Sequence, residues 1–188
     1  MFNLLQRQEL LSLAHQSIHS GLAGQQRLPW PGTPCAGLDI LRATFVTLKV
    51  KDELRGCCGS LEADRSIAED VWRNAWAAAF SDRRFTALTG REYPGCRLHI
   101  SVLSELTPLP AATQAELLHE LRPGVDGLLL QSGSAQATFL PVVWEQLPDR
   151  SDFLRHLKMK AGWSTDAWPQ NVRAWRYTTE SFGEAPEH

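Results

Sequence analysis

The order of strand-like and helix-like segments is the feature that most constrains the fold of this 188-residue chain. Apolar residues that alternate with polar ones predict strands, and apolar residues repeated every three or four positions predict helices. The two kinds of segment follow each other without the strand–helix–strand rhythm of a parallel sheet. We therefore expect an α+β fold in which a mixed or antiparallel sheet packs with helices, as one body or as two subdomains.

These periodicities place the elements along the chain. Strands are predicted at residues 43–50, 54–61, 97–103, 127–131, 137–140 and 173–179. Helices are predicted at residues 4–20, 64–81, 113–121 and 151–161. The first helix is expected to end near Gly21, and Asp64 or Ser66 to cap the second. Ser151 is expected to cap the fourth helix and Gly162 to end it. We expect a single domain over residues 1–182, with a Gly- and Pro-rich flexible linker at 21–37 and a frayed tail at 183–188.

Charge and hydropathy exclude several classes of protein. Nineteen Lys and Arg against 21 Asp and Glu leave no positive surplus, which makes binding to nucleic acid unfavourable. Apolar runs are far shorter than the roughly 20 residues that a membrane helix needs, and Met1–Leu13 lacks a signal-peptide pattern. We expect a cytoplasmic protein that does not enter the membrane. Its cysteines are then expected to be free thiols: Cys35, Cys57, Cys58 and Cys96.

The segment Leu54–Ser60, which reads LRGCCGS, holds the candidate reactive group. On a regular strand, Leu54 and Cys58 would face the core, while Arg55 and Cys57 would share the other face. A guanidinium beside a thiol favours the thiolate, the reactive form of cysteine. The other interpretation is that Cys57 packs as a small apolar residue.

Other residues near this segment have structural interpretations beside the functional ones. A glycine inside a strand, such as Gly56 or Gly59, marks a bulge or the close approach of a backbone or a ligand. Asn74 interrupts the apolar stripe of its helix, so its amide either bonds a neighbouring backbone, which we expect, or lines a polar pocket. His15 and His19 have a spacing that can bind metal, but no third ligand completes the set. We predict neither a metal nor a cofactor.

Several separated signatures give the chain a family resemblance. Between about Ala43 and Phe182 it resembles the AMME chromosomal region protein family, and in particular its bacterial branch. The signatures are Phe45-Val46-Thr47-Leu48, Leu54-Arg55-Gly56-Cys57, Asn74-Ala75, Ala78-Ala79-Phe80, Asp82, Arg84-Phe85, Ile100-Ser101-Val102-Leu103, Phe139-Leu140-Pro141, Val143-Trp144 and Lys160-Ala161-Gly162.

The family pattern around the cysteine is Leu-Arg-Gly-Cys-Ile-Gly, so Cys57 takes the cysteine position and Cys58 replaces an aliphatic residue. The chain departs from the family at Val142, where Gln is usual, and at Arg83, where Pro is frequent. The resemblance implies an α+β fold and leaves the activity unassigned. It also implies partners, because bacterial members are described as one component of a system with a Memo-like protein and a radical S-adenosylmethionine protein.

Two functional hypotheses follow. In the first, the chain is an accessory component that binds a partner or a small anionic ligand through the Arg55–Cys57 site. Its binding residues would be Arg55, Gly56, Gly59, Asn74, Asp82 and Arg84. In the alternative, the chain is an enzyme in which Cys57 is a catalytic thiolate, activated by Arg55, that acts on a small anionic substrate. Arginine suits both, since its guanidinium binds a carboxylate or a phosphate through two hydrogen bonds.

Overall fold

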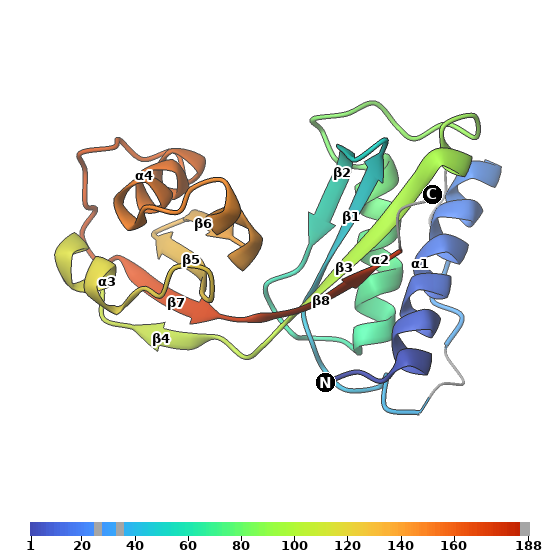
Figure 1. The fold of residues 1–188 in the computed structure, drawn as a ribbon, viewed down its shortest axis with the longest axis horizontal. Coiled ribbons are helices and arrows are strands. Elements are labelled where there is room, and N and C mark those ends of the chain that lie inside the picture. The colour runs from blue at the N-terminus through green and yellow to red at the C-terminus, as the bar shows by residue number, and fades with distance from the viewer. Residues whose placement is uncertain (25–27, 33–35, 185–188) are drawn as a thin grey trace. The chain divides into compact units, whose positions relative to one another are not determined.

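The structure is a computed structural model that describes residues 1–24, 28–32 and 36–184. It divides into unit 1, which is Met1–Leu103 with the C-terminal residues from Glu180, and unit 2, Ser104–Thr179. Each unit holds one four-stranded antiparallel sheet packed with helices, as Figure 1 shows, which confirms the α+β fold. No helix in these described ranges is both long and apolar enough to cross a membrane.

The sheet of unit 1 has the strand order β2-β1-β3-β8. The strands are β1 (Thr44–Val50), β2 (Glu53–Gly59), β3 (Cys96–Leu103) and β8 (Thr179–Gly183). The helices are α1 (Leu4–Gly24), α2 (Ile67–Phe80) and the short 3-10 helix η1 (Tyr93–Gly95). Helix α2 packs on β1 and β2, and α1 packs on α2 and β3.

One face of this sheet forms the core of unit 1. Val46, Leu48 and Ile100 are fully buried there with apolar residues of α1 and α2. The alternate residues of the same strands, such as Thr47 and His99, point to the opposite face. No helix in the described part of unit 1 packs on that second face. We call it the open face of the sheet.

Helix α1 continues through Gly21 to Gly24, so the predicted helix end near Gly21 comes too early. A Cβ atom at Gly21 would lie 2.2 Å from the ring of Phe80 in α2. The missing side chain therefore lets the two helices approach each other, and the glycine serves packing rather than termination. Helix α2 begins as predicted, because the Ser66 side chain accepts a hydrogen bond from the Glu69 backbone N–H at 3.2 Å.

The C-terminal segment is ordered further than predicted. Strand β8 ends at Gly183, and Glu184 Oε2 accepts a hydrogen bond from the Leu98 backbone N–H at 2.8 Å. The sequence predicts a single strand over residues 173–179, whereas the structure has β7 and β8 there. The two strands follow each other with one residue between them, so the sequence pattern does not separate them. The rest of the predicted tail, residues 185–188, lies outside the described residues, as does Cys35 in the predicted linker.

Unit 2 has the strand order β4-β7-β5-β6. Its elements are β4 (Thr107–Leu109), α3 (Gln114–Glu120), β5 (Gly127–Ser132), β6 (Ala135–Phe139), η2 (Pro141–Glu145), α4 (Arg150–Lys160) and β7 (Arg173–Tyr177). The Trp144 and Phe153 rings stack in its core with centroids 3.8 Å apart. Asp149 caps α4 in place of the predicted Ser151, and Gly162, with φ +77°, follows the helix end as predicted.

Candidate functional site

Strand β2 contains a β-bulge at Arg55. Leu48 pairs with Gly56 and Lys49 pairs with Leu54, so Arg55 is an extra residue in β2. Side chains of directly paired residues share a face, which puts Leu54 on the face of Lys49 and Thr47. The predicted assignment of faces is therefore wrong for Leu54, which is 43% exposed instead of facing the core.

The two glycines of β2 lie where neighbouring atoms leave no room for a side chain. A Cβ atom at Gly56 would lie 2.1 Å from the Ala78 carbonyl oxygen of α2. One at Gly59 would lie 2.3 Å from the ring of Phe45 in β1. The close approach of a backbone that is predicted for glycine inside a strand is confirmed at Gly56, whereas Gly59 makes room for a side-chain ring. Cys58, between them, packs against the core as predicted.

Arg55 forms its hydrogen bonds with the loop that joins α2 to η1. This loop consists of residues 81–92, and we call it the 81–92 loop. Its Nε and Nη2 atoms donate hydrogen bonds to Glu92 Oε1 and Oε2 at 2.9 and 3.2 Å. The Arg55 side chain is 13% exposed, and its guanidinium lies 5.9 Å from the centre of the Phe85 ring. Hydrogen bonds from Arg55, and then from Thr89, lower the pKa of Glu92 to about 2. The structure thus gives Arg55 an acidic partner rather than the thiol.

Asp82 and Arg84 of the 81–92 loop meet β2 at Cys57. Asp82 Oδ2 accepts a hydrogen bond from the Cys57 backbone N–H at 2.9 Å, and Arg84 Nη2 donates to the same oxygen at 2.8 Å. Strand β2 is an edge strand, so the Cys57 N–H group points out of the sheet and would have no partner in a neighbouring strand. The Asp82 carboxylate accepts its hydrogen bond instead. Hydrogen bonds from Arg84, and then from Cys57, lower the pKa of Asp82 to about 2.

Arg84 lies near the two thiols of β2. Its hydrogen bonds to Asp82 raise the pKa of Arg84, and the nearby Cys57 and Cys58 add to that rise. The Arg84 side chain is 58% exposed, so a partner or a ligand can reach it. The electrostatic pairing of Arg55 with Cys57 stays a prediction, and the structure adds Arg84 as a second cation near the thiols.

The Cys57 thiol lies on the open face of the sheet. The Thr47 hydroxyl, directly opposite in β1, donates a hydrogen bond to Cys57 Sγ at 3.3 Å. Cys57, Cys58 and Cys96 are all free. Burial raises the pKa of Cys58 and of Cys96 to about 11 each, so both stay protonated at neutral pH.

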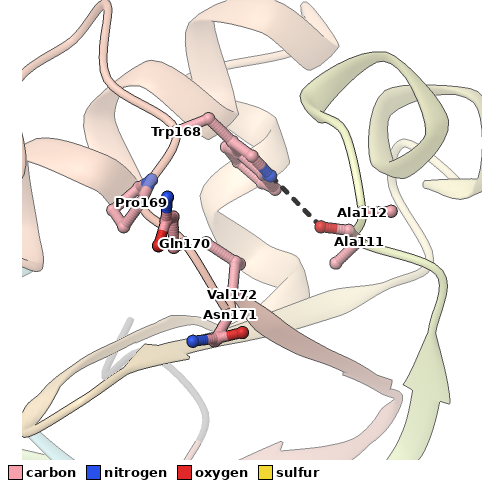
Figure 2. A pocket seen from close by; sticks show the side chains of 7 residues that line it. All are labelled: Ala111, Ala112, Trp168, Pro169, Gln170, Asn171 and Val172. Carbon is pink, nitrogen blue, oxygen red and sulfur yellow. Dashed lines mark hydrogen bonds between the residues drawn. The ribbon is translucent and has the colours of Figure 1, made fainter.

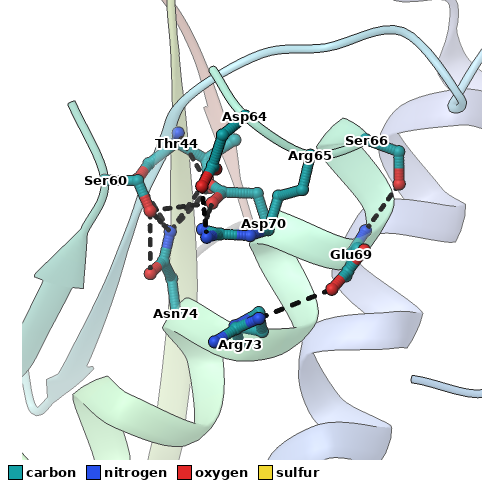
Figure 3. Close-up of polar contacts among 9 residues, drawn as sticks. All are labelled: Thr44, Ser60, Asp64, Arg65, Ser66, Glu69, Asp70, Arg73 and Asn74. Atoms are coloured by element: carbon teal, nitrogen blue, oxygen red, sulfur yellow. Dashed lines mark hydrogen bonds and ion pairs between the residues drawn. The ribbon is translucent and has the colours of Figure 1, made fainter. Parts of the chain in front are cut away.

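Asn74 belongs to a buried polar cluster around Asp70, shown in Figure 3. Its Nδ2 atom donates to Asp70 Oδ2 at 2.8 Å and to the Thr44 carbonyl oxygen at 3.0 Å. Asp70 is fully buried and also accepts hydrogen bonds from Thr44 N, Ser60 Oγ and Arg65 Nη1. The cluster ties α2 to the start of β1 and to the end of β2. Asn74 therefore has the structural role that its place on the helix predicts.

A cavity of about 440 Å³ lies in unit 2 (Figure 2). Its walls are neutral: Ala111, Ala112, Trp168, Pro169, Gln170, Asn171 and Val172. Trp168 Nε1 donates to the Ala111 carbonyl oxygen at 3.1 Å and fixes the indole across the cavity. None of the predicted site residues lines it, and its walls hold no acid, base or nucleophile.

The histidines whose spacing suggested a metal site form other contacts. His15 hydrogen-bonds to Tyr93 and Glu184, at 2.9 and 2.6 Å, and not to His19. Over the described residues, no three His, Cys, Asp or Glu side chains come together in an arrangement that could hold a metal ion.

The family is decided by comparison with known proteins. The AMMECR1 family model matches residues 11–182. The chain belongs to the AMMECR1 family. An AMMECR1-type protein of Methanosarcina acetivorans is 32% identical over 181 residues, which cover 93% of this chain and 89% of that protein. One of Methanothermobacter thermautotrophicus is 32% identical over 177 residues, with coverage of 93% and 92%.

The fold of this AMMECR1 chain also has a counterpart of known structure. The crystal structure of an uncharacterized protein from Pyrococcus horikoshii superposes with a TM-score of 0.85 and 26% sequence identity. The match covers 93% of this chain and 89% of the Pyrococcus chain. The fold of this chain is therefore shared with the Pyrococcus protein over most of both chains.

Proposed function

We propose that this AMMECR1-family protein is an accessory component that binds a partner protein through the surface formed by β2 and the 81–92 loop. The observation that carries the proposal is that two arginines of this surface, Arg55 and Arg84, already have acidic partners. Arg55 is held by Glu92 and Arg84 by Asp82, while Asp82 also fastens the Cys57 backbone. The Arg55 and Arg84 side chains are thus held in place before a partner binds, which lowers the entropic cost of binding.

The contacts of the thiol support binding over catalysis. A cysteine nucleophile is normally activated by an adjacent base or by a strongly lowered pKa. The described contact of Cys57 Sγ is the Thr47 hydroxyl, a donor that cannot remove the thiol proton at neutral pH. The partners that the family resemblance implies are a Memo-like protein and a radical S-adenosylmethionine protein.

Binding to purified Memo-like and radical S-adenosylmethionine proteins tests the proposal. We expect the Arg55→Ala and Arg84→Ala variants to weaken the complex at least about ten-fold, the loss of one charge-assisted contact. We expect Cys57→Ser to leave the affinity unchanged, and Arg155→Ala to do so as well, because Arg155 is an exposed, ion-paired arginine of α4 in unit 2, outside this surface. Titration calorimetry gives each affinity. Loss of binding in Cys57→Ser, with Arg55→Ala unaffected, contradicts the proposal.

A second function, thiolate chemistry at Cys57, is favoured by one observation: Arg84 lies close enough to Cys57 for the two groups to interact electrostatically. It predicts that Cys57 is alkylated much faster than Cys58 and Cys96, whose thiols stay protonated until the pH approaches about 11. Mass spectrometry of the native protein, after alkylation at pH values from 6 to about 10, measures each rate.

The substitution Arg84→Gln separates an activated thiol from one that is merely accessible. If Arg84 stabilises the thiolate, its loss moves the alkylation profile of Cys57 to higher pH. The rate for Cys57 would then fall several-fold at neutral pH. An unchanged profile in Arg84→Gln, or equal rates at all three cysteines, contradicts thiolate chemistry and leaves partner binding as the function.

A further inference from the structure

The open face of the unit 1 sheet carries positive charge that the surface around Arg55 and Arg84 does not use. Lys49 of β1 and Arg97 of β3 are directly paired in the strand register, and Thr47 is paired with His99 in the next row. All four point away from the core that α1 and α2 cover, because the residues that alternate with them are buried. Two cations and an imidazole therefore lie in adjacent rows of one sheet face.

The pairing of Lys49 with Arg97 has an energetic cost. Like charges directly opposite each other on neighbouring strands destabilise a sheet. Arg97 is partly compensated, since it forms an ion pair with Asp52 in the β1–β2 turn. Lys49 is exposed and forms no ion pair with any described residue. Lys49 is thus the cation of the pair that can bind an anion from outside the chain.

His99 adds a neutral hydrogen-bonding group beside this cation. A Cβ atom at Gly183 of β8 would lie 2.7 Å from His99 Nδ1. Because glycine has no Cβ, the imidazole can pack against the β8 backbone. Partial burial, and then the charge of Lys49, lower the pKa of His99. At neutral pH the ring is therefore uncharged, and it can donate one N–H group without adding to the repulsion.

We propose that Lys49, Arg97 and His99 together bind one oxyanion group, a phosphoryl or a carboxylate, of a small-molecule ligand on the open face. Lys49 supplies the uncompensated charge. Arg97 supplies guanidinium N–H groups beyond those used by Asp52, in the planar arrangement that suits an oxyanion. The bound anion would relieve the repulsion between the two cations. This site goes beyond partner binding at the 81–92 loop and does not depend on it.

Titration of the full chain with inorganic phosphate, and in parallel with acetate, tests the site at low and matched ionic strength. We expect saturable binding, followed through the backbone amide resonances of β1 and β3. Lys49→Gln is expected to weaken it about ten-fold, as for the loss of one charge-assisted hydrogen bond. Arg91→Gln removes the same charge from an exposed position in the 81–92 loop and is expected to leave binding unchanged.

The two titrations also identify the source of the oxyanion. Saturation by phosphate alone assigns a phosphoryl group, and saturation by acetate alone assigns a carboxylate. The proposal is overturned if neither anion saturates, or if Lys49→Gln and Arg91→Gln weaken binding equally, since that result means general charge attraction. Lys49 is exposed, so its variant is expected to fold, and circular dichroism verifies this. Loss of partner binding in Arg55→Ala has no bearing on either outcome.

Discussion

Replacing Asp70 with alanine is expected to lower the free energy of unfolding by about 3–5 kcal/mol, the range for removing one partner of a buried charged pair. Asp70 is fully buried, and its two oxygens accept hydrogen bonds from Thr44, Ser60, Arg65 and Asn74. Without the carboxylate, these donors stay buried and lose their acceptor, which costs more than the hydrogen bonds themselves contribute. Urea denaturation of the variant and the wild type measures the difference.

Asp64→Ala is the matched control for this prediction. Asp64 pairs with the same arginine, Arg65, at 2.8 Å, but its side chain is 54% exposed. Removing it is expected to cost less than about 1 kcal/mol, the usual value of a surface ion pair. Equal losses in the two variants would mean that Arg65, and not the buried cluster, carries the stabilisation. The variant Asp70→Asn keeps the shape but offers one oxygen acceptor in place of two, so an intermediate loss is expected.

The sequence predicts most of the secondary structure because each element carries its own periodicity. Strand β1 alternates regularly, so the open face and Thr47 could be assigned from sequence. The bulge in β2 could not, because register depends on how the strand pairs with β1 rather than on β2 alone. That one extra residue puts Leu54 on the open face, opposite to the face on which the regular pattern placed it.

The hydrogen-bond partners of the site residues could not be predicted from the sequence for a similar reason. Glu92 follows Arg55 by 37 positions, and only the path of the 81–92 loop brings the two together. Asp70 has the sequence position of an ordinary acidic residue in the first turns of a helix. Its burial depends on contacts with Thr44, the first residue of β1, and with Ser60, which follows β2. Local patterns thus identify residue types suited to a site, whereas tertiary contacts decide their roles.

Gly56→Ala is expected to affect both stability and the candidate site. The added Cβ would lie 2.1 Å from the Ala78 carbonyl oxygen, which is a backbone atom and cannot rotate away as a side chain can. Strand β2 or helix α2 must therefore move, and overpacking of this kind costs about 1–3 kcal/mol. A shift of β2 also pulls the Cys57 N–H away from Asp82, since the two residues are held at 2.9 Å.

Two measurements separate these effects. Urea denaturation gives the loss of stability, with Gly90→Ala as the control, because a Cβ at Gly90 meets nothing within 4 Å. That control is expected to be neutral or stabilising by up to about 1 kcal/mol through the unfolded state. Amide hydrogen exchange at Cys57 reports the bond to Asp82 and is expected to speed up in Gly56→Ala alone. If Gly56→Ala is as stable as Gly90→Ala and exchange at Cys57 is unchanged, the glycine is not required for β2 to pack on α2. The geometry of the site would then depend on the 81–92 loop alone.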